Sequence, residues 1–63
     1  MIKYIYDMCE KHNCAIDFCI APDGGMSIIV YGKRKDHIIV RADWDEETIK
    51  ESINDTIRRA CYD

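Results

Sequence analysis

The stretch from Met26 to Ala42, MSIIVYGKRKDHIIVRA, has the clearest structural pattern in this chain. It contains two runs of β-branched and aromatic residues, 27–31 and 37–40, and the polar segment 32–36 separates them. Two such runs joined by a short loop that contains glycine are typical of a β-hairpin. We therefore expect the segments on either side to cover this hairpin.

The chain is 63 residues long, which predicts a single domain over residues 1–63. A domain of this size buries only ~60% of the surface that its unfolded chain exposes, so such domains often gain stability from a partner or a second copy. We find no long apolar run and no signal-peptide pattern. We therefore expect a soluble, cytoplasmic protein without membrane contact.

The segments before the hairpin predict a helix followed by a strand. Within residues 1–12, Ile2, Ile5 and Cys9 recur at helical spacing, and Asn13 is a plausible stop because asparagine tolerates the left-handed conformation. Residues 15–21 alternate between apolar and polar positions, as a half-buried strand does, and residues 22–25, PDGG, then predict a turn.

The last segment has the pattern of a helix start. Asp45 suits the N-cap position, where Trp44 and Ile49 then occupy the two positions of a hydrophobic staple. Glu46 and Glu47 follow in the first turn, which the helix dipole favours for acids.

These elements predict an α+β fold, a two-layer αβββα arrangement in which a three-stranded antiparallel meander carries both helices on one face. The sheet face toward the helices is expected to hold Ile16, Phe18, Ile20, Met26, Ile28, Val30, Ile38 and Val40. We call the opposite side of the sheet the open face.

The topology sorts the charged residues into two ends. At one end lies the acidic pole, which we define as Asp43, Asp45, Glu46 and Glu47. We expect it to bind a basic groove of a partner protein, one that normally holds nucleic acid. The alternative is that these acids only stabilise the start of the helix.

At the other end lies the basic pole, defined as Lys33, Arg34, Lys35, Arg58 and Arg59. Its alternative function is contact with nucleic-acid phosphates. No aromatic residue stands at the hairpin tip to stack on bases, so nucleic acid ranks below a protein partner.

The open face offers a third surface. Cys19, Ile29, Tyr31 and Ile39 are expected to form an apolar patch there, either for a partner or for a homodimer. A small structural homodimer is therefore a second alternative function.

We find no sequence pattern that predicts catalysis or metal binding. The four cysteines suit reduced packing positions in a cytosolic chain. Cys9, His12 and Cys14 group metal-binding residue types, but their spacing matches no common structural zinc site, and a fourth ligand would have to come from Cys61 or His37. No serine is placed to be activated by either histidine. We expect no metal, no cofactor and no enzymatic activity.

The order α-β-β-β-α resembles that of double-stranded-RNA-binding domains. Those domains grip phosphates with a basic start of the second helix, where this chain has the acidic residues 43–47, DWDEE. The chain also resembles small RNA-cleaving toxins of the HicA type in residues 5–13 and in the loop 32–35. Their catalytic histidine follows a glycine-serine pair, but residues 25–27 here read GMS. The resemblance therefore implies the topology without the activity.

A third resemblance is to small acidic phage-encoded inhibitors, among them anti-CRISPR proteins with αβββα order. It is carried by size, acidity, element order and a composition of eleven isoleucines without leucine, which suits an AT-rich coding sequence. It implies a phage or mobile-element protein that inhibits a host nucleic-acid-handling protein, of CRISPR type, by protein–protein binding through an acidic surface.

Overall fold

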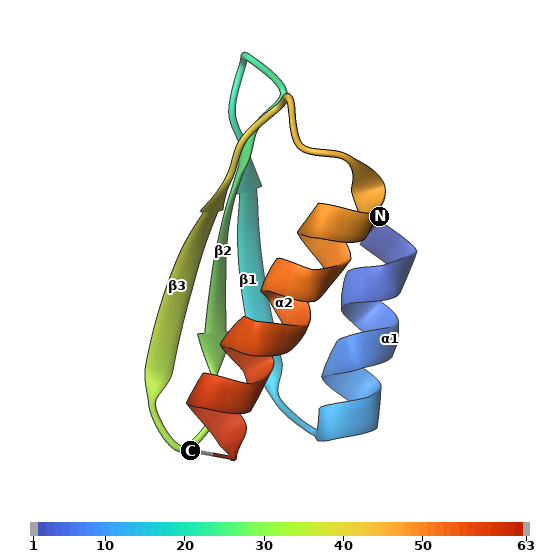
Figure 1. The fold of residues 1–63 in the computed structure, drawn as a ribbon. Coiled ribbons are helices and arrows are strands. Elements are labelled where there is room, and N and C mark those ends of the chain that lie inside the picture. Colours follow the sequence, from blue (N-terminus) through green and yellow to red (C-terminus); the bar gives the residue numbers. More distant parts are fainter. Residues whose placement is uncertain (1, 63) are drawn as a thin grey trace.

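The computed structural model describes residues 2–62. Along the chain its elements are α1 (Ile2–His12), β1 (Ala15–Ile20), β2 (Met26–Tyr31), β3 (Lys35–Val40) and α2 (Glu46–Cys61). The three strands form one antiparallel sheet in the order β1-β2-β3, and both helices cover the same face of it (Figure 1). The predicted two-layer αβββα meander is confirmed.

The strand register places residues in straight rows across the sheet. Asp17 of β1 pairs with Ile29 of β2, which pairs with His37 of β3. The neighbouring row on the same face holds Cys19, Ser27 and Ile39. Because β2 is central, β1 and β3 are both edge strands.

The hairpin has a shorter loop than the predicted segment 32–36. Tyr31 pairs with Lys35 and Val30 pairs with Asp36, which leaves three residues, 32–34, in the loop. The predicted start of the third strand at His37 was wrong, because the polar residues Lys35 and Asp36 were assigned to the loop. The structure places Asp36 on the helix-facing side of β3, where Arg59 of α2 binds its carboxylate.

The predicted helix ends are confirmed. Asn13 has a φ of 51°, the left-handed conformation expected where α1 stops. Asp45 is the N-cap of α2, and its carboxylate accepts a hydrogen bond of 2.8 Å from the backbone N–H of Thr48. Trp44 and Ile49 both pack against the core, as a hydrophobic staple requires.

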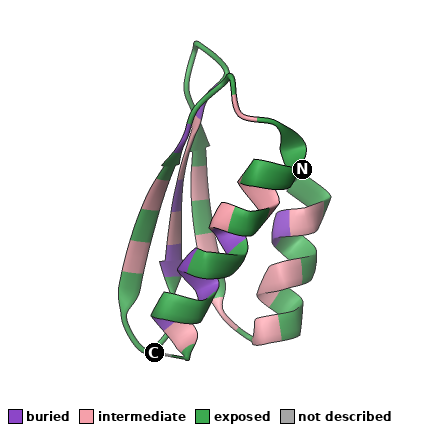
Figure 2. Cartoon of the chain, viewed as in Figure 1, coloured by how far each residue is buried: buried purple, intermediate pink, exposed green. Residues whose placement is uncertain are grey.

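The core lies between α2 and the sheet, with one buried side chain from α1 (Figure 2). Its fully buried members are Ile5, Ile28, Val30, Val40, Ile53, Ile57 and Ala60. Burial of each isoleucine or valine side chain in this core contributes about 1.5–3 kcal/mol before the entropy cost of ordering it.

The prediction that Ile20 is buried beneath the helices is wrong, since its side chain is 62% exposed. It ends the edge strand β1, and Figure 1 shows the β1–β2 turn extending beyond the end of the helix layer. Alternation along a strand reports which face a side chain is on, but not whether a helix reaches that far. Among residues 2–62, no helix is both long and apolar enough to cross a membrane.

Candidate interaction surfaces

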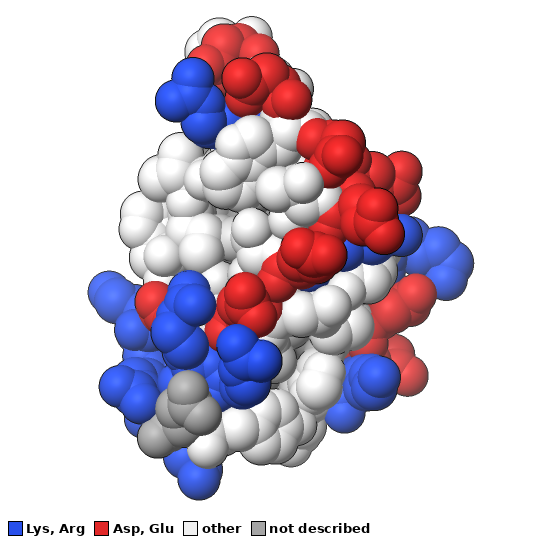
Figure 3. Space-filling view, viewed as in Figure 1, with Lys and Arg blue, Asp and Glu red and all other residues white. Residues whose placement is uncertain are grey.

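The acidic side chains gather around the start of α2 and continue as a band along that helix (Figure 3). The acidic pole is exposed. Beyond it, Glu51 and Asp55 follow Glu47 at intervals of four residues, which places the three carboxylates on one face of α2. We call the acidic pole together with Glu51 and Asp55 the acidic band.

The sequence prediction stopped at the first turn and missed Glu51 and Asp55. The signal that identifies them is the spacing of four from Glu47, read along a helix rather than along the chain. The interaction surface is therefore one side of α2 and not only its end.

Several carboxylates of the band have partners within the chain. Asp43 lies 3.4 Å from Arg41, and Asp55 lies 2.9 Å from Arg58. Glu46 lies 3.3 Å from Lys50. These are exposed ion pairs of the kind that contribute little to stability.

Asp45 is held differently, as the helix cap. Hydrogen bonding by Thr48 lowers the pKa of the Asp45 carboxyl, so this residue stays ionised to lower pH than usual. The charge of Asp45 is therefore tied to the hydrogen bond that caps α2.

Glu47 and Glu51 make no ion pair within residues 2–62. Glu51 also stands four residues from a like charge on each side, from Glu47 and from Asp55. Each such pair destabilises a helix by about 0.2–0.5 kcal/mol. Asp55 is paired with Arg58 and Glu47 lies in the first turn, but Glu51 has neither advantage, which makes Glu51 the strongest indication of a functional surface on α2.

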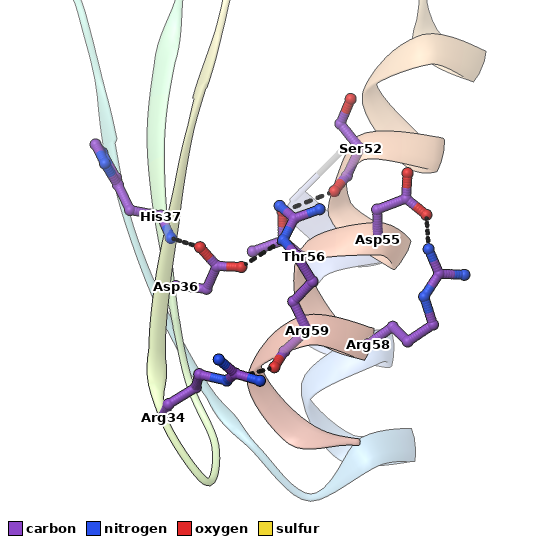
Figure 4. Close-up of polar contacts among 8 residues, drawn as sticks. All are labelled: Arg34, Asp36, His37, Ser52, Asp55, Thr56, Arg58 and Arg59. Carbon is purple, nitrogen blue, oxygen red and sulfur yellow. Dashed lines mark hydrogen bonds and ion pairs between the residues drawn. The ribbon is translucent and has the colours of Figure 1, made fainter. Parts of the chain in front are cut away.

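The basic pole is brought together by the fold, because the hairpin tip lies against the end of α2 (Figure 4). Arg34 donates a hydrogen bond of 3.1 Å from Nε to the carbonyl of Arg59. Arg59 in turn donates from Nε to Asp36 at 2.7 Å and from Nη2 to Thr56 Oγ1 at 3.3 Å. The bond from Arg34 joins the hairpin tip to α2, the bond to Asp36 joins β3 to α2, and the bond to Thr56 lies within the helix.

The same contacts set the protonation of Asp36. Two hydrogen bonds to the carboxylate lower the pKa of Asp36. The larger effect comes from Arg59 and the smaller from the backbone N–H of His37. Arg34, Arg58 and Arg59 thus each have a structural partner. Within residues 2–62, Arg58 and Arg59 are ion-paired, Arg34 bonds a backbone carbonyl, and Lys33 and Lys35 make no ion pair.

The open face carries the predicted apolar patch. Ile39 is 59% exposed, Tyr31 is 42% exposed, Cys19 is exposed and Ile29 is half-buried. At one end of this face lies a hollow of about 550 Å³ between the β1–β2 turn and the segment that follows β3. Cys19, Ile20, Ile39 and Arg41 are among the residues that line it.

The open face also corrects one expectation about the histidines. Ser27 Oγ lies 3.0 Å from His37 Nε2, so a serine does stand beside a histidine. The register explains this contact, because Ser27 pairs with Ile39 and lies diagonally across from His37. No carboxylate within residues 2–62 hydrogen-bonds the other side of this ring, and we interpret the contact as a cross-strand hydrogen bond.

The cysteines are free thiols. Cys14 and Cys61 pack against the core. The pKa of the Cys14 thiol is raised to about 11, mainly because the thiol is removed from water and secondly because Cys61 lies beside it. Across the described residues 2–62, no group of three histidine, cysteine or acidic side chains is placed to hold a metal ion. Cys9, His12 and Cys14 therefore do not come together as a metal-binding group in the described residues. His12 Nδ1 instead lies 2.8 Å from the Tyr62 hydroxyl.

Comparison of the chain with protein-family models, with curated proteins and with solved structures finds no match.

Proposed function

We propose that this protein acts by binding another protein, and that the acidic band on α2 is the surface that binds. The observation that carries this proposal is the row Glu47, Glu51 and Asp55, in which like charges follow one another on the exposed side of a helix. Two of the three have no ion-pair partner within residues 2–62. Such a row is complementary to a basic surface.

The chemistry of the row favours a particular kind of basic surface. Residues four apart rise by about 6 Å along a helix, so the carboxylates form a regular line of negative charge. A nucleic-acid backbone presents the same feature to the proteins that bind it. The proposed partner is therefore a protein whose basic groove binds nucleic acid, and the proposed effect is competition for that groove.

The finer part of the proposal concerns the partner's identity. Small size, acidity and αβββα order support a phage or mobile-element inhibitor that acts on a nucleic-acid-handling protein of CRISPR type. This role requires no catalytic residue and no cofactor of the chain.

Competition for DNA tests the proposal. A fluorescent DNA duplex is bound to a guide-loaded CRISPR effector, and its release is followed by anisotropy as the protein is added. We expect release by the wild-type chain, and a requirement for at least ~10-fold more protein with Glu51→Lys, because the row loses its central charge. Glu10→Lys, a reversal at an exposed glutamate of α1, is the matched control and should match the wild type.

The outcomes separate the two parts of the proposal. Absence of DNA release by the wild-type chain would contradict the CRISPR-type partner. Equal release by the wild type and by Glu51→Lys would contradict the acidic band as the binding surface.

A second candidate function is nucleic-acid binding through the basic pole. The contact between Arg34 and the end of α2 favours it, because it joins the hairpin tip and the helix terminus into one basic surface. This function predicts binding that weakens steeply with added salt and with Lys33→Ala and Lys35→Ala together. A gel shift without any binding at ~50 mM salt would exclude it.

A further inference from the structure

The two edges of the open face carry charges of opposite sign. On the β1 edge the charged residue is Asp17, whereas the β3 edge carries Lys35 and His37. Arg41 follows β3 directly and is paired with Asp43. Between the edges lie the apolar residues Ile29 and Tyr31 of β2. Asp17 and Lys35 make no ion pair within the described part of the chain, residues 2–62.

We propose that this face binds a second copy of the same chain, through a two-fold axis that runs parallel to the strands. Such a rotation places β2 over the partner's β2 and each β1 over the partner's β3. Asp17 and His37 lie in the same row of the sheet. Asp17 therefore lies opposite the partner's His37, one row from the partner's Lys35.

The charges select this axis over the other face-to-face arrangement. A two-fold axis perpendicular to the strands would place β3 over the partner's β3. That arrangement brings the basic edges of the two copies together and the two Asp17 carboxylates together. Like charges brought together at an interface disfavour it.

The apolar residues suit the centre of this interface. The parallel axis places Ile29 over the partner's Ile29 and Cys19 over the partner's Ile39, with the charged residues at the rim. An apolar centre with a charged rim is the usual composition of a protein interface. Sheets that pack face to face in this way lie about 10 Å apart.

The dimer leaves both helix layers on the outside. Each copy then presents its own acidic band, one on either side of the assembly, since α2 covers the face of the sheet opposite to the interface. The proposal rests on the open face alone and does not depend on the proposed function of the acidic band.

Sedimentation equilibrium of the full chain at low salt, over a range of protein concentrations, tests the proposal. We expect a reversible dimer for the wild type. Asp17→Lys and His37→Glu should each raise the dimer dissociation constant at least ~10-fold. The first places a lysine near the partner's Lys35, and the second places a glutamate opposite the partner's Asp17. The double variant Asp17→Lys with His37→Glu should restore dimerisation, since the new charges attract. Glu10→Lys on α1 should leave the dimer unchanged.

The rescue is specific to this arrangement. Within one copy, two strand spacings, or about 10 Å, separate Asp17 from His37, so the two substitutions couple directly only across the interface. Far-UV circular dichroism shows whether each variant is folded. A wild-type chain that remains monomeric up to ~1 mM would overturn the proposal. A folded double variant that dimerises no better than the single variants would overturn it as well.

Discussion

At the scale of single residues, Gly32 is the position where the hairpin tip meets the end of α2. A Cβ atom added there would lie 2.6 Å from the Sγ of Cys61 and 2.7 Å from the carbonyl oxygen of Ala60. Because a backbone oxygen cannot move aside independently, the tip would have to shift away from the helix. The sequence shows Gly32 only as a loop glycine, and its contact with Cys61 follows from the packing.

We predict that Gly32→Ala lowers the free energy of unfolding by about 1–3 kcal/mol, the range for a side chain forced into a filled space. Urea unfolding followed by circular dichroism measures the change. The neighbouring exposed substitution Lys33→Ala is the control and should change stability by less than about 0.5 kcal/mol. Equal stability of the Gly32→Ala variant and the wild type would contradict the close packing of the tip on α2.

Asp36 is a second residue whose function depends on tertiary contact. Its pKa in the folded chain lies below the ordinary aspartate value of about 3.9, because Arg59 donates a hydrogen bond to the carboxylate. The ionised form therefore stabilises the fold above pH ~4, and this stabilisation disappears as the pH falls through the lowered pKa.

We predict that Asp36→Asn reduces stability at pH 7 by less than about 1 kcal/mol, as expected for a partly exposed ion pair. The difference between variant and wild type should shrink toward zero as the pH is lowered from 5 to ~2. Urea unfolding at a series of pH values measures this difference. A difference that is independent of pH would show that the carboxylate charge is not what Asp36 contributes.

At the scale of elements, α2 combines a well-formed start with an unfavourable surface. Asp45 caps the helix, and the arginines of its last turn suit the negative end of the dipole. Glu51, in contrast, stands between two like charges on the exposed side. A helix selected only for stability would not keep this arrangement.

We predict that Glu51→Gln stabilises the chain by about 0.4–1 kcal/mol, since it removes two unfavourable i,i+4 pairs. The same variant should weaken competition for DNA at a basic partner. Thermal unfolding and the anisotropy assay on one protein preparation measure the two effects. A variant that is less stable than the wild type would contradict the repulsion, and unchanged competition would contradict the functional interpretation of the row.

At the scale of the whole molecule, a 63-residue domain has a small core, and the open face leaves Tyr31 and Ile39 in solvent. Dimerisation through that face would add buried apolar surface to the folded state only. The stability of the chain would then depend on its concentration, because a second copy binds the folded chain and not the unfolded one.

We predict that the midpoint of thermal unfolding rises by several degrees when the protein concentration is raised 100-fold. Tyr31→Asp, which places a charge near the axis of the proposed dimer, should remove this dependence. Differential scanning calorimetry at several concentrations measures it. The same midpoint at every concentration would argue against a dimer that forms in this range.

The elements, their order and their faces follow from patterns among neighbouring residues. Alternation in strands and spacing in helices report local geometry, and Asp45 and Asn13 mark helix ends through hydrogen bonds and dihedral angles within a few residues. The αβββα topology follows from these local rules. So does the presence of Cys19, Ile29 and Ile39 on one face of the sheet.

The extent of each surface and the pairing of its charges depend on tertiary contacts. Ile20 lies on the predicted face but beyond the reach of the helices, and Asp36 belongs to a strand because Arg59, 23 residues away, binds its carboxylate. The spacing of four that extends the acidic pole into the acidic band can be read from the sequence, whereas the pairing of Asp55 with Arg58 is a contact of the folded chain. The physical reason is that burial and pairing depend on residues distant in sequence, whereas periodicity depends only on neighbours.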